Sequence, residues 1–235
     1  MTIRTRQRLS HLGEMLEDVR GGHMVPAAFQ RPYVWGRGDV EEMWTSIASN
    51  DPLGGLLLWE PEDRETAGLM SRSHLGPIPV ATGADSRLIL DGQNRLVSLA
   101  WSTIDPSTAP SGLPGCEVWQ TSEDLILVAD HAASGGATIR FVPRREATGM
   151  TMPIWKLFDN RAFNSHVVEN WSDDVDVQTT IEWLASLQTC VREARVVVST
   201  IEGGDAEQAK RRFLRMARVG VPMSAEDFDA IARTV

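Results

Sequence analysis

Apolar residues recur every three to four positions in several stretches of the chain, a spacing typical of amphipathic helices. The first such stretch predicts a helix over residues 8–20 (Leu9, Leu12, Leu16 and Val19), which Gly21 and Gly22 would end. A second helix is expected to be capped by Asp39 and to end at residues 50–52 (Val40, Met43, Trp44 and Ile47). Further helices are predicted over residues 177–191 and 205–218, and a capping box at residues 224–227 would open the last one.

Short, continuously apolar runs between these helices predict strands. They lie at residues 56–59, 88–90, 125–128, 138–142 and 196–198. Gly135 and Gly136 would join the third and fourth runs as a hairpin. The polar segment 60–86 predicts a loop with one weak strand near residues 78–80, and residues 24–35 are expected to be extended or looping. A segment rich in Pro, Gly and Ser at residues 105–115 suggests an internal boundary between residues 1–104 and 105–235.

Composition narrows the classes of protein to consider. With 235 residues, of which 42% are apolar, the chain can bury a sizeable core as one large domain or two small ones. The net charge of −9 argues against coating of DNA or of anionic membranes by the whole surface, so any contact with nucleic acid must be local. The two cysteines form no CxxC motif and no disulfide framework. No apolar leader or stretch of about 18 apolar residues is present, so we expect a cytoplasmic protein without membrane contact.

The segment from Leu88 to Leu96 is the strongest candidate for chemistry, because a strand runs through a tight turn into the start of a helix. Unpaired N–H groups and the positive end of the helix dipole would meet there and suit a phosphate. Gly92 would allow close approach, and Asp91 could cap the helix or hold a metal ion. Gln93 could orient a water, and Arg95 could neutralise phosphate charge. The alternative is that Asp91 is only a cap and Arg95 only a surface residue.

A second candidate segment covers residues 29–35, Phe-Gln-Arg-Pro-Tyr-Val-Trp. Pro32 stiffens the backbone, so that Gln30, Arg31 and Tyr33 could be displayed towards phosphate or bases. Phe29, Val34 and Trp35 are expected to pack in the core instead.

Taken together, these motifs resemble the N-terminal domain of GmrSD- and SspE-type defence proteins. That family carries approximately F-Q-R-x-Y-V-W, then P-I-G-S, then D-G-Q-Q-R, which match residues 29–35, 51–55 and 91–95 here. Residues 212–217 and 220–224 are similar to a further family pattern, F-x-R-x-N-x-x-G-x-P-L-S. Asn94 replaces the family's second Gln, and Ala217 stands where Asn is usual.

The resemblance implies an α+β fold of the ParB/sulfiredoxin type, with a mixed sheet core and surrounding helices. It also implies that the turn binds a nucleoside triphosphate, with Mg²⁺ held through Asp91. Asp91, Gln93 and Arg95 would then be catalytic, and Gln30, Arg31, Tyr33, Gly92 and Asn94 would bind the nucleotide. Relatives sense modified DNA and control a His-Asn-His nuclease, a pattern that this sequence does not contain.

A basic helix face offers a separate contact for nucleic acid. Arg211, Arg215 and Arg218 share one face of the helix expected at residues 205–218. The alternative is an ordinary solvated face whose cations pair with nearby acids.

Three functions therefore stay open at the level of sequence. The chain could be a nucleoside triphosphatase or ParB-like nuclease, or a module that binds nucleotide or DNA without turnover. It could also be a partner subunit that serves a separately encoded nuclease or effector.

Overall fold

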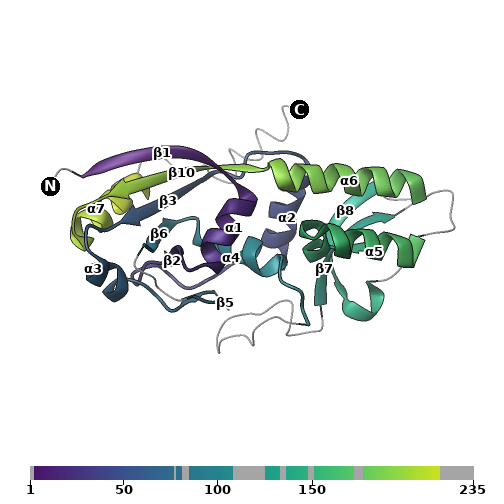
Figure 1. Cartoon of the computed structure of the whole chain (residues 1–235), viewed down its shortest axis with the longest axis horizontal. Coiled ribbons are helices and arrows are strands. Elements are labelled where there is room, and N and C mark those ends of the chain that lie inside the picture. The colour runs from purple at the N-terminus through teal and green to yellow at the C-terminus, as the bar shows by residue number, and fades with distance from the viewer. Residues whose placement is uncertain are drawn as a thin grey trace, which may run out of the picture.

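The structure is a computed structural model and describes residues 3–76, 78–80, 85–107, 125–132, 136–147, 151–171 and 177–217. Helices and strands are mixed along the chain, which confirms the predicted α+β class. Figure 1 shows an elongated molecule with a larger sheet at one end, helices in the middle and a smaller sheet at the other end. The relationship to the ParB/sulfiredoxin fold stays a prediction.

The larger sheet contains strands from both ends of the chain, in the order β1-β10-β3-β6-β2. Its members are β1 (Arg4–His11), β10 (Arg195–Glu202), β3 (Gly55–Glu60), β6 (Arg87–Asp91) and β2 (Met24–Pro26). β10 pairs antiparallel with β1 and parallel with β3, and β6 pairs antiparallel with β3 and parallel with β2. The sheet is therefore mixed, and its second strand is supplied by residues far from the others in sequence.

Three helices occupy the middle of the molecule, α1 (Leu12–Arg20), α2 (Arg37–Ala48) and α4 (Gln93–Ser102). Each buries the apolar stripe that its sequence predicts, such as Leu12, Met15, Leu16 and Val19 on α1. The indole N–H of Trp44 on α2 donates to the hydroxyl of Ser102 on α4 at 3.1 Å, so this buried polar pair is satisfied inside the core.

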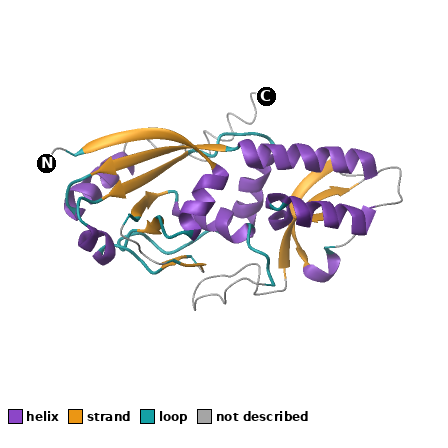
Figure 2. Ribbon diagram, in the orientation of Figure 1, coloured by secondary structure: helices purple, strands orange, loops and turns teal. Residues whose placement is uncertain are grey.

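The smaller sheet has the order β8-β7-β9. Its strands are β7 (Leu125–Ala132), β8 (Gly136–Pro143) and β9 (Thr151–Pro153), and the 3₁₀ helix η1 (Arg144–Glu146) follows β8. The 3₁₀ helix η2 (Ile154–Phe158) leads to α5 (Asn160–Trp171), and α6 (Val177–Glu193) lies beside it in Figures 1 and 2. α6 runs back along the molecule and continues into β10, so one segment connects the two sheets.

Smaller elements complete the end that holds the larger sheet. α3 (Arg64–Leu69) follows β3, and β4 (His74–Leu75) pairs with β5 (Ile78–Pro79). α7 (Ala206–Ala217) comes directly after β10, and the guanidinium of Arg212 donates to the hydroxyl of Thr5 on β1 at 3.0 Å. Elements from before and after the expected boundary at residue 105 therefore lie in one sheet and share one core.

The structure corrects several local predictions. Residues 8–11 belong to the edge strand β1 rather than to a helix, and Leu9 is 63% exposed opposite Val197 of β10. Gly36, not Asp39, caps α2; Asp39 lies one turn inside and accepts from the Gly36 N–H at 2.8 Å. α3 and α5 were not predicted. The helix expected to open at residues 224–227 lies outside the described residues.

Among the residues that the structure describes, no helix combines the length and apolar character needed to cross a bilayer.

His166 on α5 is a buried polar residue that links this helix to the smaller sheet by a hydrogen bond. Its Nε2 lies 2.7 Å from the carbonyl oxygen of Thr151, and the ammonium of Lys156 lies 2.9 Å from its Nδ1. Lysine can only donate, so Nδ1 accepts and the imidazole is neutral, with its proton on Nε2. Burial and the Lys156 charge hold the pKa of His166 below its ordinary value, whereas the bond to Thr151 and the charge of Glu169 act in the opposite direction.

We expect the free energy of unfolding to decrease as the pH falls below about 6.5, the ordinary pKa of histidine. The lowered pKa means that the unfolded chain takes up this proton before the folded chain does, so protonation favours unfolding. The decrease should be smaller in His166→Asn, whose side chain stays neutral. Urea denaturation between pH 7.5 and 5 measures both, and identical slopes in the two proteins would contradict the assignment.

Candidate functional site

The turn between β6 and α4 has a backbone that only glycine accommodates without strain. Gly92 has φ = 88°, in the left-handed region, and is buried. A Cβ atom added there would lie 2.1 Å from Cδ2 of Leu56 on the neighbouring strand β3. The close packing of β3 against this turn therefore fixes where α4 begins.

No described side chain caps the start of α4. Gly92 is the N-cap residue and no side chain caps the helix, so the alternative in which Asp91 caps α4 is wrong. The first helical bond runs from the Leu96 N–H to the Gly92 carbonyl at 3.1 Å. The preceding N–H groups have no backbone partner within the described part of the chain and lie at the positive end of the helix dipole, an arrangement suited to an anion.

The segment of residues 28–35, which we call the ribbon, is fastened beside this turn by hydrogen bonds. The side-chain amide of Gln30 donates to the Leu90 carbonyl, and that of Gln93 donates to the Arg31 carbonyl at 3.2 Å. Further along the ribbon, the Tyr33 hydroxyl lies 2.9 Å from the Ser98 hydroxyl on α4. Two of the predicted motifs, about 60 residues apart in the sequence, are thus joined directly.

Arg72 holds the ribbon from its other side. Its guanidinium donates to the Ala28 carbonyl at 3.2 Å and to the Gln30 carbonyl. The Ala28 N–H donates in turn to the Met70 carbonyl at 2.7 Å. The ribbon is irregular but held along its backbone, which leaves the side chain of Arg31 available to face a ligand.

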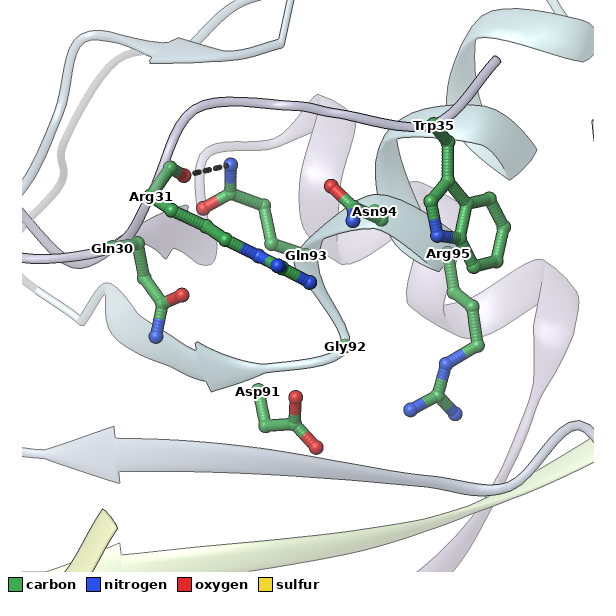
Figure 3. A pocket seen from close by; sticks show the side chains of 8 residues that line it. All are labelled: Gln30, Arg31, Trp35, Asp91, Gly92, Gln93, Asn94 and Arg95. Atoms are coloured by element: carbon green, nitrogen blue, oxygen red, sulfur yellow. Dashed lines mark hydrogen bonds between the residues drawn. The ribbon is translucent and has the colours of Figure 1, made fainter. Parts of the chain in front are cut away.

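These elements enclose a cleft of about 190 Å³, lined by Gln30, Arg31, Trp35, Asp91, Gly92, Gln93, Asn94 and Arg95. We call it the turn cleft. In Figure 3 the guanidinium of Arg31 extends from the ribbon towards the turn. Within the described residues, neither this guanidinium nor the exposed carboxylate of Asp91 has a hydrogen-bond or ion-pair partner. A cation, a carboxylate and an open helix start therefore border the same small space.

Arg95 is anchored by the loop of residues 51–55, the second of the three family-like motifs. Its Nη1 donates to the Leu53 carbonyl at 2.6 Å, and Gly54 passes so close that an added Cβ would lie 2.8 Å from that nitrogen. Gly54 has φ = 72°, so glycine also suits this position. Arg95 was expected to neutralise phosphate charge. One of its donors is directed at the loop of residues 51–55, while the side chain still lines the cleft.

The side chain of Gln93 is almost fully buried, and only one end of its amide has a hydrogen-bond partner among the described residues. Its Nε2 donates to the Arg31 carbonyl, which fixes the orientation of the amide. Its Oε1 has no hydrogen-bond partner within the described residues. A buried acceptor of this kind at the edge of a cleft suits a donor such as a water or a ligand hydroxyl.

The structure brings together all but one of the turn and ribbon residues that the sequence singled out. Tyr33 does not line the turn cleft and instead contacts Ser98 on α4. Of the three residues expected in the core, Phe29 and Trp35 are partly buried against it, although Trp35 also lines the cleft, whereas Val34 is 55% exposed. Trp35 lies outside any apolar repeat and directly before the Gly36 cap, the one sequence feature that could have marked it.

The basic face of α7 is described only in part. Arg211 and Arg215 are exposed, whereas Arg218 and the family-like residues 220–224 lie outside the described residues, as does the side chain of Ala217. Nη1 and Nη2 of Arg212 donate to Thr5 and to the Ile3 carbonyl, and this residue therefore serves the fold.

Comparison with known proteins gives two findings. The family model described as GmrSD restriction endonuclease, N-terminal domain, matches residues 12–229. An uncharacterized protein of Methanocaldococcus jannaschii is 33% identical over 106 residues, which cover 42% of this chain and 18% of that protein. The chain thus aligns with less than a fifth of that relative's length.

Gly92→Ala should destabilise the fold by about 2 kcal/mol or more, because it combines a strained φ with the contact to Leu56. Gly38→Ala is the matched control, since Gly38 lies in α2 with open space around its Cα. That change should stabilise by about 0.5–1 kcal/mol. Chemical denaturation measures both, and equal effects of the two substitutions would contradict the requirement for glycine in the turn.

Proposed function

The chain belongs to the family of GmrSD restriction endonuclease N-terminal domains, and from this premise we propose that its turn cleft binds the phosphates of a nucleoside triphosphate and promotes their hydrolysis. Membership supports a role for the chain as a component of a restriction-type system of phage defence. In such a system the domain would act as a nucleotide-dependent sensor or regulator.

The observation that carries the proposal is the combination of charges and N–H groups around one cleft. An open helix start, backed by Gly92, supplies N–H donors for phosphate oxygens. Arg31 supplies a guanidinium that is not engaged within the described residues, and guanidinium pairs with phosphate through two parallel hydrogen bonds. The helix start and the Arg31 guanidinium come from separate segments of the chain. Their convergence on one cleft favours a binding site over a coincidental arrangement of surface groups.

Mg²⁺ fits the residues present through a single carboxylate. Within the described ranges, no three His, Cys, Asp or Glu side chains cluster to hold a metal ion. Mg²⁺ is commonly held by one or two carboxylates together with substrate phosphates and waters, and the exposed Asp91 beside the helix start could provide that ligand. When bound, the ion would neutralise charge on the phosphates.

Hydrolysis would need a positioned water and stabilisation of charge. Gln93 would orient the water whose oxygen bonds to the terminal phosphorus. Its Oε1 is buried in this structure, so ligand binding would have to expose it. The bond from that phosphorus to the bridging oxygen then breaks, leaving nucleoside diphosphate and inorganic phosphate. Arg31 and Arg95 would stabilise the charge that develops on the phosphate oxygens, and Asn94 would line the same space.

A second candidate function is nucleotide binding without turnover. The contact that favours it is the bond from Arg95 to the Leu53 carbonyl, which directs one guanidinium donor away from the helix start. Under this alternative Arg95 shapes the cleft, and Arg31 with the helix start performs the binding.

Contact with DNA, modified or not, and with a nuclease partner completes the proposal. Family membership supports both. The exposed Arg211 and Arg215 on α7 offer a local basic surface on a chain whose net charge is −9. A separately encoded nuclease or effector would then receive the signal of the nucleotide state.

Phosphate release from the four nucleoside triphosphates with Mg²⁺ tests the catalytic proposal. Arg95→Ala should lower turnover about 10²-fold with a smaller loss of affinity, as for other positioned donors. Arg31→Ala should chiefly weaken binding, because this guanidinium faces the cleft. If nucleotide is bound but never hydrolysed, the binding-only function is correct.

Arg145→Ala is the control, since this side chain is 83% exposed, lies on η1 and does not line the cleft. It should leave affinity and turnover unchanged. Folded Arg31→Ala and Arg95→Ala proteins that match the wild type in both would remove these residues from the site.

The chain alone should not cut plasmid DNA efficiently, because the described residues hold no cluster of metal ligands and the sequence has no His-Asn-His pattern. Gel analysis of supercoiled plasmid with Mg²⁺ or Mn²⁺ measures this. Metal-dependent nicking that Asp91→Ala abolishes would favour a ParB-like nuclease instead.

A further inference from the structure

A larger pocket of about 570 Å³ adjoins the turn cleft, and we call it the apolar pocket. Gln30, Arg31 and Asp91 line both spaces, so the two are neighbours that share a wall. The other lining residues are apolar: Phe29, Leu57, Phe213 and Met216. A polar cleft with cations therefore lies next to a space walled by two aromatic rings, a leucine and a methionine.

The walls of the apolar pocket come from three parts of the fold. Phe29 belongs to the ribbon, Leu57 is a buried residue of β3, and Phe213 and Met216 lie three residues apart on α7 and so share one face of that helix. α7 is held against β1 by the bonds from Arg212 to Thr5 and to the Ile3 carbonyl. The pocket is thus shaped by secondary structure and not by a single loop.

We propose that the apolar pocket receives the nucleobase of the nucleotide whose phosphates occupy the turn cleft. The inference rests on the proposed function. It assigns a binding place to the base of the nucleotide, which the phosphate site does not contact. A nucleobase is a flat, aromatic ring system, and aromatic side chains bind any base through its face. Methionine sulfur also makes favourable contacts with aromatic rings. The volume lies within the range of ordinary ligand pockets.

Gln30 and Arg31 line both spaces and would therefore face the sugar and the first phosphate, between the base and the terminal phosphate. Another recess next to the turn cleft, of about 250 Å³, shares Trp35 and Arg95 with it. Its walls include the carboxyl groups of Asp39 and Glu42, and Asp39 is already bonded to the Gly36 N–H. That recess is smaller and more acidic, which disfavours a ligand that carries several negative charges.

Calorimetric titration with Mg²⁺ tests the inference, using ATP, GTP, CTP, UTP and inorganic triphosphate as probes. The wild type should bind at least one nucleotide more tightly than inorganic triphosphate, which has no base. Phe213→Ala should weaken nucleotide binding about tenfold or more, the range seen when a stacking ring is removed. Binding of inorganic triphosphate should not change.

Leu214→Ala is the matched control, because Leu214 is a partly exposed neighbour on α7 that does not line the pocket. Met216→Asn is a second test variant that does not depend on the partly buried Phe213, since Met216 is 51% exposed and its replacement leaves the core intact. Met216→Asn should weaken nucleotide binding in the same direction, and Leu214→Ala should not. A thermal melt of each variant reports folding.

Two different failures can be told apart. If the wild type binds neither inorganic triphosphate nor any nucleotide, the proposed function fails and the inference fails with it. If the wild type binds both equally well, or if Phe213→Ala and Met216→Asn leave nucleotide affinity unchanged, only the base pocket is overturned. A tenfold loss on filling the acidic recess through Ser46→Phe, with none in Phe213→Ala, would move the base to that recess.

Discussion

The contact between Gly92 and Leu56 is the constraint on which the site depends. β3 pairs with β6, and Leu56 of β3 lies where a Cβ of residue 92 would otherwise be. Because residue 92 has no side chain, β6 can turn sharply and α4 can begin immediately after it. The first N–H groups of α4 then face the turn cleft instead of the core. The absence of a Cβ atom at Gly92 therefore satisfies both the packing of the core and the geometry of the anion-binding turn.

The ribbon is positioned through its backbone carbonyls, and this has an electrostatic consequence. Arg72 and the amide of Gln93 both donate to carbonyls of the ribbon, and Gln30 donates to β6. These bonds fix the path of the chain without using the guanidinium of Arg31. A cation that is carried on a fixed backbone and not neutralised by the described residues can attract a phosphate even though the whole chain carries a net charge of −9. The local field at the cleft, and not the net charge, governs what binds there.

Local pattern predicted the interior elements well and the edges poorly. α2 and α6 follow from apolar spacing because each buries one face, whereas α4 is buried almost all round. β1 does not, because residues 4–9 of this edge strand are exposed and carry no alternation that sequence could reveal. β1 forms because it pairs with β10. The position of β10 between β1 and β3 depends on pairing between residues far apart in the sequence, so no local stretch of sequence can predict it. The same limit applies to the site: the motifs indicated which residues matter, but only tertiary structure places Trp35 in the cleft and Tyr33 against Ser98.

The loop of residues 51–55 explains why glycines recur around this cleft. Gly54 adopts a left-handed backbone and leaves room for the Arg95 guanidinium, which then reaches the Leu53 carbonyl. A side chain at residue 54 would have to displace Arg95, just as one at residue 92 would have to displace Leu56. The loop after α2, the turn after β6 and the ribbon thus restrict one another through contacts that need small residues at fixed points. A ligand at the helix start would meet a backbone whose course is already set, which lowers the entropy lost on binding.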